Sequence, residues 1–191
     1  LDYELTEIVK NTGESWADIC RRKVGFIADV CEKYPDKKVF WIDVDCELFS
    51  IPEFILNSTG DIIGFQRGFG SPIKIGYSVR GRFWEPCFWG INTSMQAREM
   101  IRRASDLEKK SSITATDDYF FEEAWRATSP NMTFQIIPSN CAVDKGTGTL
   151  DGHEAFFRFG SSGQVDNFKN KVQQHKGNKK KKFVLKREIL E

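Results

Sequence analysis

Residues 39–45 read VFWIDVD, an apolar run that ends abruptly in two carboxylates. The β-branched and aromatic residues predict a buried strand. The preceding residues 15–34 place apolar side chains at spacings of three and four, which predicts an amphipathic helix. Ser15 is a suitable N-cap for this helix and Pro35 ends it. A helix, a short turn and a buried strand in this order indicate an α/β fold.

The remaining pattern extends this α/β reading along one domain. Strands are expected at 61–66, 86–92, 134–138 and 155–159, and helices at 51–56, 93–110, 117–128 and from about residue 165. The glycine-rich residues 67–86 predict a long mobile loop that orders over a bound donor. The domain is expected to span residues 1–175, followed by a basic tail or linker at 176–191.

Composition excludes several classes of protein. Hydrophobic residues make up 40% of the chain and aromatic residues 13%, which argues against disorder. No run of 18 apolar residues is present, so we expect no transmembrane segment. The lysine run at 179–182 lacks interleaved aromatics, so we read it as a solvated tail or a link to a further domain and expect no nucleic-acid partner.

The number and spacing of the cysteines indicate the redox state of the compartment in which the protein is expected. Five cysteines are scattered without a CxxC spacing, which favours reduced thiols and a cytoplasmic location. The chain begins at Leu1 rather than Met, so a Golgi-lumenal protein whose leader was removed stays open as the alternative.

The two carboxylates at the end of the 39–45 run predict a metal site. In a continuous strand Asp43 and Asp45 would project from one face. Carboxylates at the end of a buried strand are costly unless a cation compensates them. Two hard oxygen ligands suit Mn²⁺ or Mg²⁺ better than Zn²⁺. The alternative is a pair of surface aspartates on an edge strand or turn.

Residues 40–53, FWIDVDCELFSIPE, resemble the DxD region of GT-A glycosyltransferases, which use nucleotide-sugar donors. The resemblance extends from Lys23 to Ser162 and includes several segments in the order of that family. These are the helical segment Arg22–Ile27, the DxD residues, the strand Cys87–Asn92, the acidic pair within Thr116–Phe120 and the glycine-rich turn within Phe157–Ser162.

This resemblance implies a Rossmann-like GT-A domain with a mixed sheet flanked by helices. It also implies a metal-dependent glycosyltransferase that moves a sugar from a nucleotide sugar to a saccharide or glycoconjugate acceptor. In the family the second DxD carboxylate binds the metal that bridges the donor diphosphate, a role that falls on Asp45. Asp43 would contact the ribose, or the metal through water. The acidic pair would supply the catalytic base, with Asp118 ahead of Asp117.

The chain departs from the family pattern in two places. Many members have a histidine near the last strand as a third metal ligand, but the position reads Arg158, which would instead clamp the diphosphate. His153 is then the candidate for the third ligand. Only 42 residues precede Asp43, whereas three strands with crossovers need about 80. An N-terminal truncation that leaves the first nucleotide-binding strands upstream of Leu1 would explain the shortfall.

Other candidate residues follow from their positions beside these segments. Lys23 and Arg22 would contact the diphosphate, and the backbone around Ser161 would offer N–H groups to phosphate. The aromatic and acidic residues that flank the 67–86 loop would form an acceptor platform or part of the core. They are Trp84, Glu85 and Trp89.

Two other functions stay open from the sequence. A nucleotidyltransferase also uses paired aspartates and Mg²⁺, although the glycine-rich N-terminal loop usual in that class is not found here. A non-catalytic carbohydrate- or nucleic-acid-binding module would use the Trp-containing loop or the basic tail, but such a surface has no need of Asp43 and Asp45 at a strand end.

Overall fold

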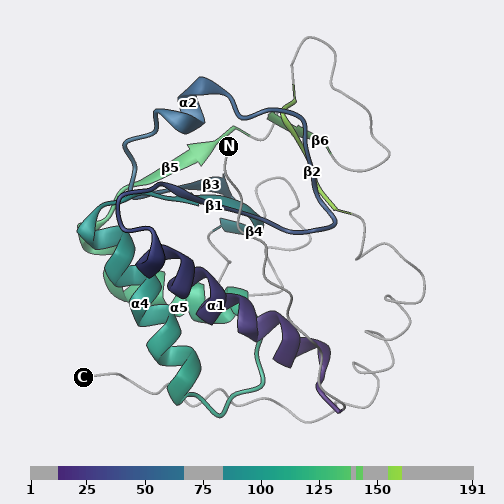
Figure 1. The fold of residues 1–191 in the computed structure, drawn as a ribbon, viewed down its shortest axis with the longest axis vertical. Helices are drawn as coiled ribbons and strands as arrows, with labels where there is room; N and C mark the ends of the chain where they lie inside the picture. Colours follow the sequence, from purple (N-terminus) through teal and green to yellow (C-terminus); the bar gives the residue numbers. More distant parts are fainter. Residues whose placement is uncertain (1–12, 67–83, 139–140, 144–154, 161–191) are drawn as a thin grey trace, which may run out of the picture.

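The computed structural model describes residues 13–66, 84–138, 141–143 and 155–160 (Figure 1). Its main sheet has four strands in the order β1 (Val39–Ile42), β4 (Trp84–Ile91), β3 (Ile62–Gln66) and β5 (Phe134–Ile137). β4 runs antiparallel to both β1 and β3, whereas β5 is parallel to β3. This mixed sheet with helices against it confirms the α/β prediction and is compatible with a Rossmann-like fold.

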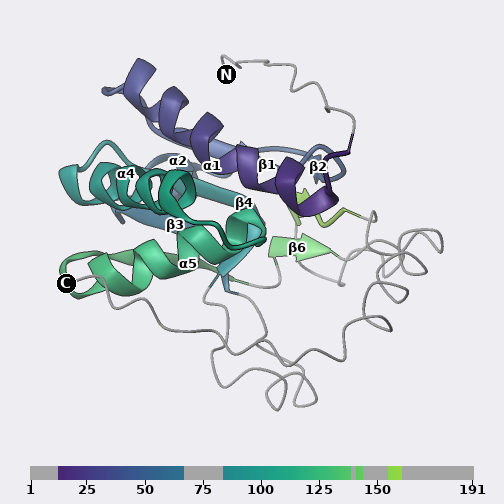
Figure 2. The same cartoon turned by 90° about the horizontal axis from the view of Figure 1, so that it is seen from below.

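Three helices cover one face of the main sheet. They are α1 (Trp16–Lys33), α4 (Met95–Lys110) and α5 (Asp117–Thr128), and Figures 1 and 2 show them side by side in one layer. Their buried side chains form one core with Ile62, Trp89 and Ile91 of the sheet. A single 3₁₀ turn, η1 (Ser129–Asn131), follows α5 and leads to β5.

The opposite face of the main sheet carries a second core. It includes Ile63, Phe65 and Phe88 from the sheet and Ile55 from the short helix α2 (Glu53–Leu56). A second sheet of three strands contributes to it, in the order β2 (Glu47–Leu48), β7 (Phe157–Arg158) and β6 (Ala142–Val143). Because both faces of β3 are covered, its residues 62–65 are all buried, which explains an apolar run without alternation.

Local sequence signals fix the ends of α1 in the predicted places. The Ser15 hydroxyl accepts from the Asp18 N–H at 3.2 Å, and the Asp18 carboxylate accepts from the Ser15 N–H at 2.9 Å. This reciprocal capping box satisfies two N–H groups that the first helical turn leaves without partners. The helix ends at Lys33, just before Tyr34 and Pro35.

Some expected elements differ from the structure. The two-residue strands β2 and β6 were not expected, and the strand expected at 155–159 is paired only at Phe157–Arg158. Residues 84–86 of the expected loop belong to β4, whereas 67–83, the helix expected from residue 165 and the tail at 176–191 lie outside the described residues. Within the described ranges, none of the helices combines the length and the hydropathy required to cross a bilayer.

Candidate functional site

The two aspartates lie on a turn that follows β1. β1 ends at Ile42, and the Cys46 N–H donates to the Asp43 carbonyl at 2.9 Å to close the turn. The prediction that Asp43 and Asp45 project from one face of a strand is therefore wrong, because the ladder ends before Asp45. The Asp43 N–H still donates to the Cys87 carbonyl of β4 at 2.8 Å, so Asp43 stays aligned with the sheet.

The Asp43 side chain is held by α1. Lys23 donates to Asp43 Oδ1 at 2.8 Å, and the indole N–H of Trp41 donates to the same oxygen at 2.7 Å. The Lys23 ammonium lies over the Trp41 ring, 4.7 Å from its centroid, and also donates to the Pro86 carbonyl at 3.1 Å. One third of the Asp43 side chain (33%) stays accessible, so its carboxylate can still meet a ligand.

Lys23 also binds the first residue of α5. Its ammonium lies 2.9 Å from Asp117 Oδ2, and both side chains are only 10% exposed. One buried cation thus joins two carboxylates that are far apart in sequence. The prediction that Lys23 would contact a diphosphate receives no support from this geometry, because its donors are directed to Asp43, Asp117 and Pro86.

Burial and charge set the pKa values in this cluster. Burial by itself would lower the pKa of Lys23, but the Asp117 and Asp43 carboxylates outweigh it and raise that pKa above its usual value. Burial raises the pKa of Asp117, and the attraction of Lys23 opposes this only in part. The pKa of the Cys20 thiol, one helical turn before Lys23, rises to about 12 through burial and the nearby Asp117 carboxylate.

The two aspartates at the start of α5 differ in burial and in their partners. Asp117 is buried and ion-paired, so it could not meet a solvent-borne hydroxyl without leaving Lys23. Asp118 is half-buried, and its carboxylate accepts a hydrogen bond from the Thr116 hydroxyl. Of the two, Asp118 is the carboxylate that an acceptor could reach.

Asp45 lies against the glycine-rich turn that follows β7. The Asp45 side chain is exposed, yet a Cβ added to Gly160 would lie 2.3 Å from its carboxylate. Only a glycine at position 160 leaves the Asp45 carboxylate in this place. The backbone of a distant segment therefore limits where the second carboxylate of the DxD turn can lie.

The other candidate ligands are placed as follows. Arg158 donates to Glu47 at 2.6 Å and its guanidinium lies over the Phe49 ring, 5.1 Å from the centroid. Arg158 therefore contacts β2 and the residue Phe49 that follows it closely. Diphosphate binding by Arg158 stays a prediction. Arg22 pairs with Glu14. His153 and Ser161 lie outside the described residues.

One of the three residues expected in the acceptor platform, Trp89, lies in the core. Trp89 is fully buried and packs edge-on against Phe121 at a centroid distance of 4.9 Å. Of the two alternatives for Trp89, the core position beneath α5 is therefore confirmed, and the side chain does not form part of an acceptor platform. Acceptor contacts of Trp84 and Glu85, at the start of β4, stay a prediction.

The DxD turn offers few ligands of its own to a metal. Within the described ranges, no three or more histidine, cysteine, aspartate or glutamate side chains are grouped so that they could hold an ion. The Asp43 and Asp45 carboxylates nevertheless fit Mn²⁺ or Mg²⁺, because these ions bind to one or two carboxylates and fill the remaining positions with water and substrate phosphates. Such a site would depend on the nucleotide for its affinity.

Sequence reasoning missed three contributors to this site. The sequence places Trp41 only on a strand and Gly160 only in a glycine-rich turn, whereas Trp41 donates to Asp43 and Gly160 lies against Asp45. The third is the Cys46 thiol beside the turn, which donates to Asp45 Oδ1 at 3.9 Å. The alternation of Trp41 and Asp43 could have revealed the first contact, whereas the contact of Gly160 with Asp45 depends on a distant segment.

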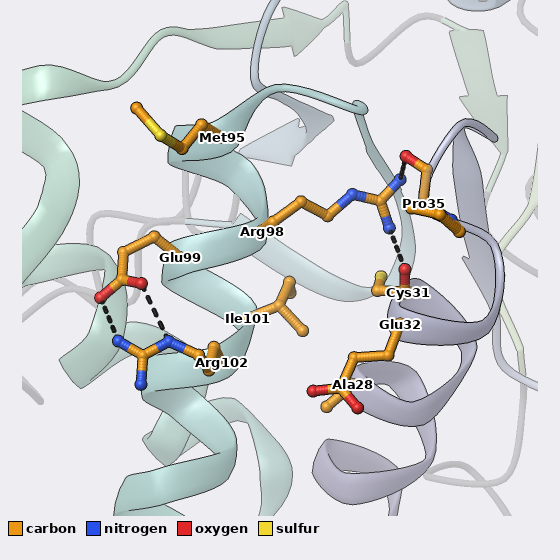
Figure 3. A pocket seen from close by; sticks show the side chains of 9 residues that line it. All are labelled: Ala28, Cys31, Glu32, Pro35, Met95, Arg98, Glu99, Ile101 and Arg102. Carbon is orange, nitrogen blue, oxygen red and sulfur yellow. Dashed lines mark hydrogen bonds and ion pairs between the residues drawn. The ribbon is translucent and has the colours of Figure 1, made fainter.

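A separate groove lies between the C-terminal half of α1 and the start of α4 (Figure 3). Its volume is about 320 Å³ and its floor includes Ala28, Cys31 and Ile101. Figure 3 shows Arg98 crossing it toward the end of α1, where its guanidinium donates to the Cys31 carbonyl at 2.9 Å. Lys23 lies in the other half of α1, so this groove is not part of the aspartate site.

Comparison with known proteins adds no further information on identity: neither a protein-family model nor a curated protein sequence matches the chain.

Proposed function

We propose that this chain is the catalytic domain of a metal-dependent glycosyltransferase. It would transfer a sugar from a nucleotide-sugar donor to a saccharide or glycoconjugate acceptor. The observation that carries the proposal is the turn with Asp43 and Asp45 at the carboxyl end of β1, whose first carboxylate is held by Lys23 and through it joined to α5. Ligands of open α/β sheets bind beyond the carboxyl ends of strands.

Each residue has a defined task in this proposal. Asp45, exposed at the turn, is the principal metal ligand, and Asp43 is the fixed carboxylate that contacts the ribose or a metal-bound water. A divalent ion bound there would neutralise negative charge on the departing nucleoside diphosphate. Lys23 holds Asp43 and Asp117 in place and does not contact the donor.

Asp118 is proposed as the general base. Its carboxylate would accept the proton of the acceptor hydroxyl while that oxygen bonds to the sugar C1 carbon. The bond between C1 and the diphosphate oxygen breaks in the same reaction, and the nucleoside diphosphate departs with the electron pair. The half-buried position of Asp118 at the start of α5 supports this choice over Asp117.

A thermal-shift screen separates this proposal from the other functions. A glycosyltransferase should be stabilised by one nucleoside diphosphate or its nucleotide sugar in the presence of Mn²⁺, and much less without the ion. Stabilisation by a nucleoside triphosphate, with pyrophosphate release, would indicate a nucleotidyltransferase. Stabilisation by a free saccharide alone, without Mn²⁺ or nucleotide, would indicate a binding module.

Two adjacent substitutions test the base. Asp118→Asn should leave donor affinity nearly unchanged and should cost at most about 1 kcal/mol of stability, because it removes one partly exposed carboxylate from the first turn of α5. Its transfer rate should fall by roughly 10²–10⁴-fold, the usual contribution of a positioned base. The matched variant Asp117→Asn should instead lose stability, because it removes a buried ion pair. Full transfer activity in Asp118→Asn would remove Asp118 as the base.

A further inference from the structure

β1 is an end strand of the main sheet among the residues that the structure describes, with β4 as its neighbour. The Asp43 N–H donates to the Cys87 carbonyl of β4 at 2.8 Å, and the same register continues along β1. Because backbone groups alternate in an antiparallel pair, the N–H and C=O groups of Phe40 and Ile42 point away from β4. The outer edge of β1 therefore presents backbone donors and acceptors to a further strand.

The composition of β1 is typical of an interior strand. Its residues, VFWI, are all apolar, whereas edge strands commonly carry a charge, a proline or a bulge that prevents further pairing. Val39 and Trp41 pack against the core formed with the three helices, and Phe40 packs against the core on the opposite face. An apolar strand with both faces covered is characteristic of the inside of a sheet.

We propose that residues 3–9, which lie outside the described residues, pair in parallel along the outer edge of β1. This segment reads YELTEIV and contains four residues of types enriched in strands, namely Tyr3, Thr6, Ile8 and Val9. Residues 10–14 connect it to Ser15, the N-cap of α1, and a connection of about two to six residues is usual between a strand and a helix. Gly13 lies in this connection with a φ of 91°, a conformation that glycine adopts without strain where the chain turns.

α1 fixes the direction of the pairing. Lys23, in the first half of α1, contacts Asp43 at the carboxyl end of β1, so α1 begins near that end and returns along the sheet to the start of β1. The segment before α1 therefore ends near the carboxyl end of β1, which makes it parallel to β1. A strand, a helix and a parallel strand form a βαβ unit, in which the helix supplies the crossover that parallel strands require.

The hand of the crossover favours the β1 edge over the β5 edge. From β3 the chain passes through β4, α4 and α5 to the parallel strand β5, which lies on the side of β3 away from β1. α1 lies in the same helix layer as α4 and α5 (Figure 2). A crossover through α1 advances in the same direction, and so has the same hand, only if residues 3–9 lie outside β1.

The added strand would lengthen the sheet edge at which the DxD turn lies. Because the carboxyl ends of parallel strands meet at one edge, residues 10–12 would come beside Asp43. Ligands of open α/β sheets bind beyond this edge, so the segment would extend the wall of the donor site. This consequence rests on the proposed function, whereas the pairing itself does not.

Amide hydrogen exchange of the full chain, followed by nuclear magnetic resonance without nucleotide or metal, tests the pairing. The Phe40 and Ile42 amides should exchange about 100-fold more slowly than unstructured amides, as should alternate amides within residues 3–9. Nuclear Overhauser contacts should join Phe40 and Ile42 to residues 3–9. A mixture of isotope-labelled and unlabelled protein should show that these contacts arise within one chain.

The double variant Leu5→Pro/Thr6→Pro removes one N–H from each side of the segment. The Phe40 and Ile42 amides should then exchange at nearly the rate of unstructured amides. The Asp43 N–H, which donates to β4, should stay protected and so shows that β1 and β4 remain paired. Asp2→Pro, just before the segment, is the matched control and should leave the protection of Phe40 and Ile42 unchanged.

Three results would overturn the proposal. They are free exchange of the Phe40 and Ile42 amides in the wild type, protection that the double variant leaves unchanged, and contacts of these residues with β1 of a second copy. The last result, together with a dimer in sedimentation analysis, would assign the edge to a second copy instead. If the double variant unfolds and Asp43 loses its protection, the wild-type contacts decide. Because neither nucleotide nor metal is present, a failure of the proposed function does not affect this readout.

Discussion

Replacing Lys23 by methionine tests the buried cluster that links the DxD turn to α5. Lys23→Met keeps most of the side-chain volume and removes the charge that pairs with both Asp43 and Asp117. Asp43 is 33% exposed and can recover solvent, whereas Asp117 is 10% exposed and cannot. Removing one partner from a buried ion pair lowers the free energy of unfolding by about 3–5 kcal/mol. Because Asp43 can still be solvated, we expect a loss near the lower limit, about 3 kcal/mol.

The loss should depend on pH with a defined sign. Without Lys23, the pKa of Asp117, already above its unfolded value of 3.8, should rise further. A carboxyl whose pKa is raised by folding binds more protons in the folded state, so stability falls as pH increases through the window above 3.8. The difference from wild type should therefore be small near pH 4 and largest near neutral pH.

Urea unfolding at both pH values measures this effect, with unchanged m-values as the sign that only stability has changed. The double variant Lys23→Met/Asp117→Asn should regain part of the loss, because it no longer buries an unpaired charge. Arg102→Met is the matched control: its ion pairs with Glu99 and Asp106 are exposed, and their loss should cost less than about 1 kcal/mol. A Lys23→Met loss as small as that of the control, or one independent of pH, would refute the reasoning.

Two further substitutions test the contacts that position the fold and the site. Gly160→Ala places a methyl group 2.3 Å from the Asp45 carboxylate, which must then move. We expect Mn²⁺-dependent nucleotide affinity to fall by about tenfold in a binding titration. Stability should change little, because the end of the Asp45 side chain can shift without moving the backbone. Gly25→Ala, whose Cβ meets nothing within 4 Å, is its control and should stabilise α1 by about 0.5–1 kcal/mol. Arg98→Ala should cost about 2 kcal/mol or more in urea unfolding, because the guanidinium donates to the Cys31 and Lys37 carbonyls at 2.9 and 2.6 Å; a loss below about 0.5 kcal/mol would contradict that role.

The helices and the main strands could be predicted because their signals are local. Ser15, Asp18 and Pro35 mark the limits of α1, and the apolar run at 62–65 marks a strand covered on both faces. The two-residue strands β2 and β6 lack such a signal, since their pairing depends on β7, which lies far along the chain. Tertiary contact rather than local propensity decides such short strands.

The candidate site was only partly predictable for a related reason. Asp43, Asp45 and the acidic pair could be identified as residues, but the sequence gives no sign that Lys23 lies between Asp43 and Asp117. Trp89 could be assigned from the sequence either to an acceptor platform or to the core, and its burial decides for the core. Charge compensation and burial depend on elements that pack together from distant parts of the chain.

The most direct test of the central claim is a calorimetric titration of nucleoside diphosphates into wild type and Asp45→Asn, each with and without Mn²⁺. The substitution keeps the shape of the side chain and removes its charge. The account predicts Mn²⁺-dependent binding by the wild type that is lost in Asp45→Asn, with the same urea midpoint for both proteins. Equal affinity in the two proteins, or wild-type binding that does not change when Mn²⁺ is removed, would contradict it.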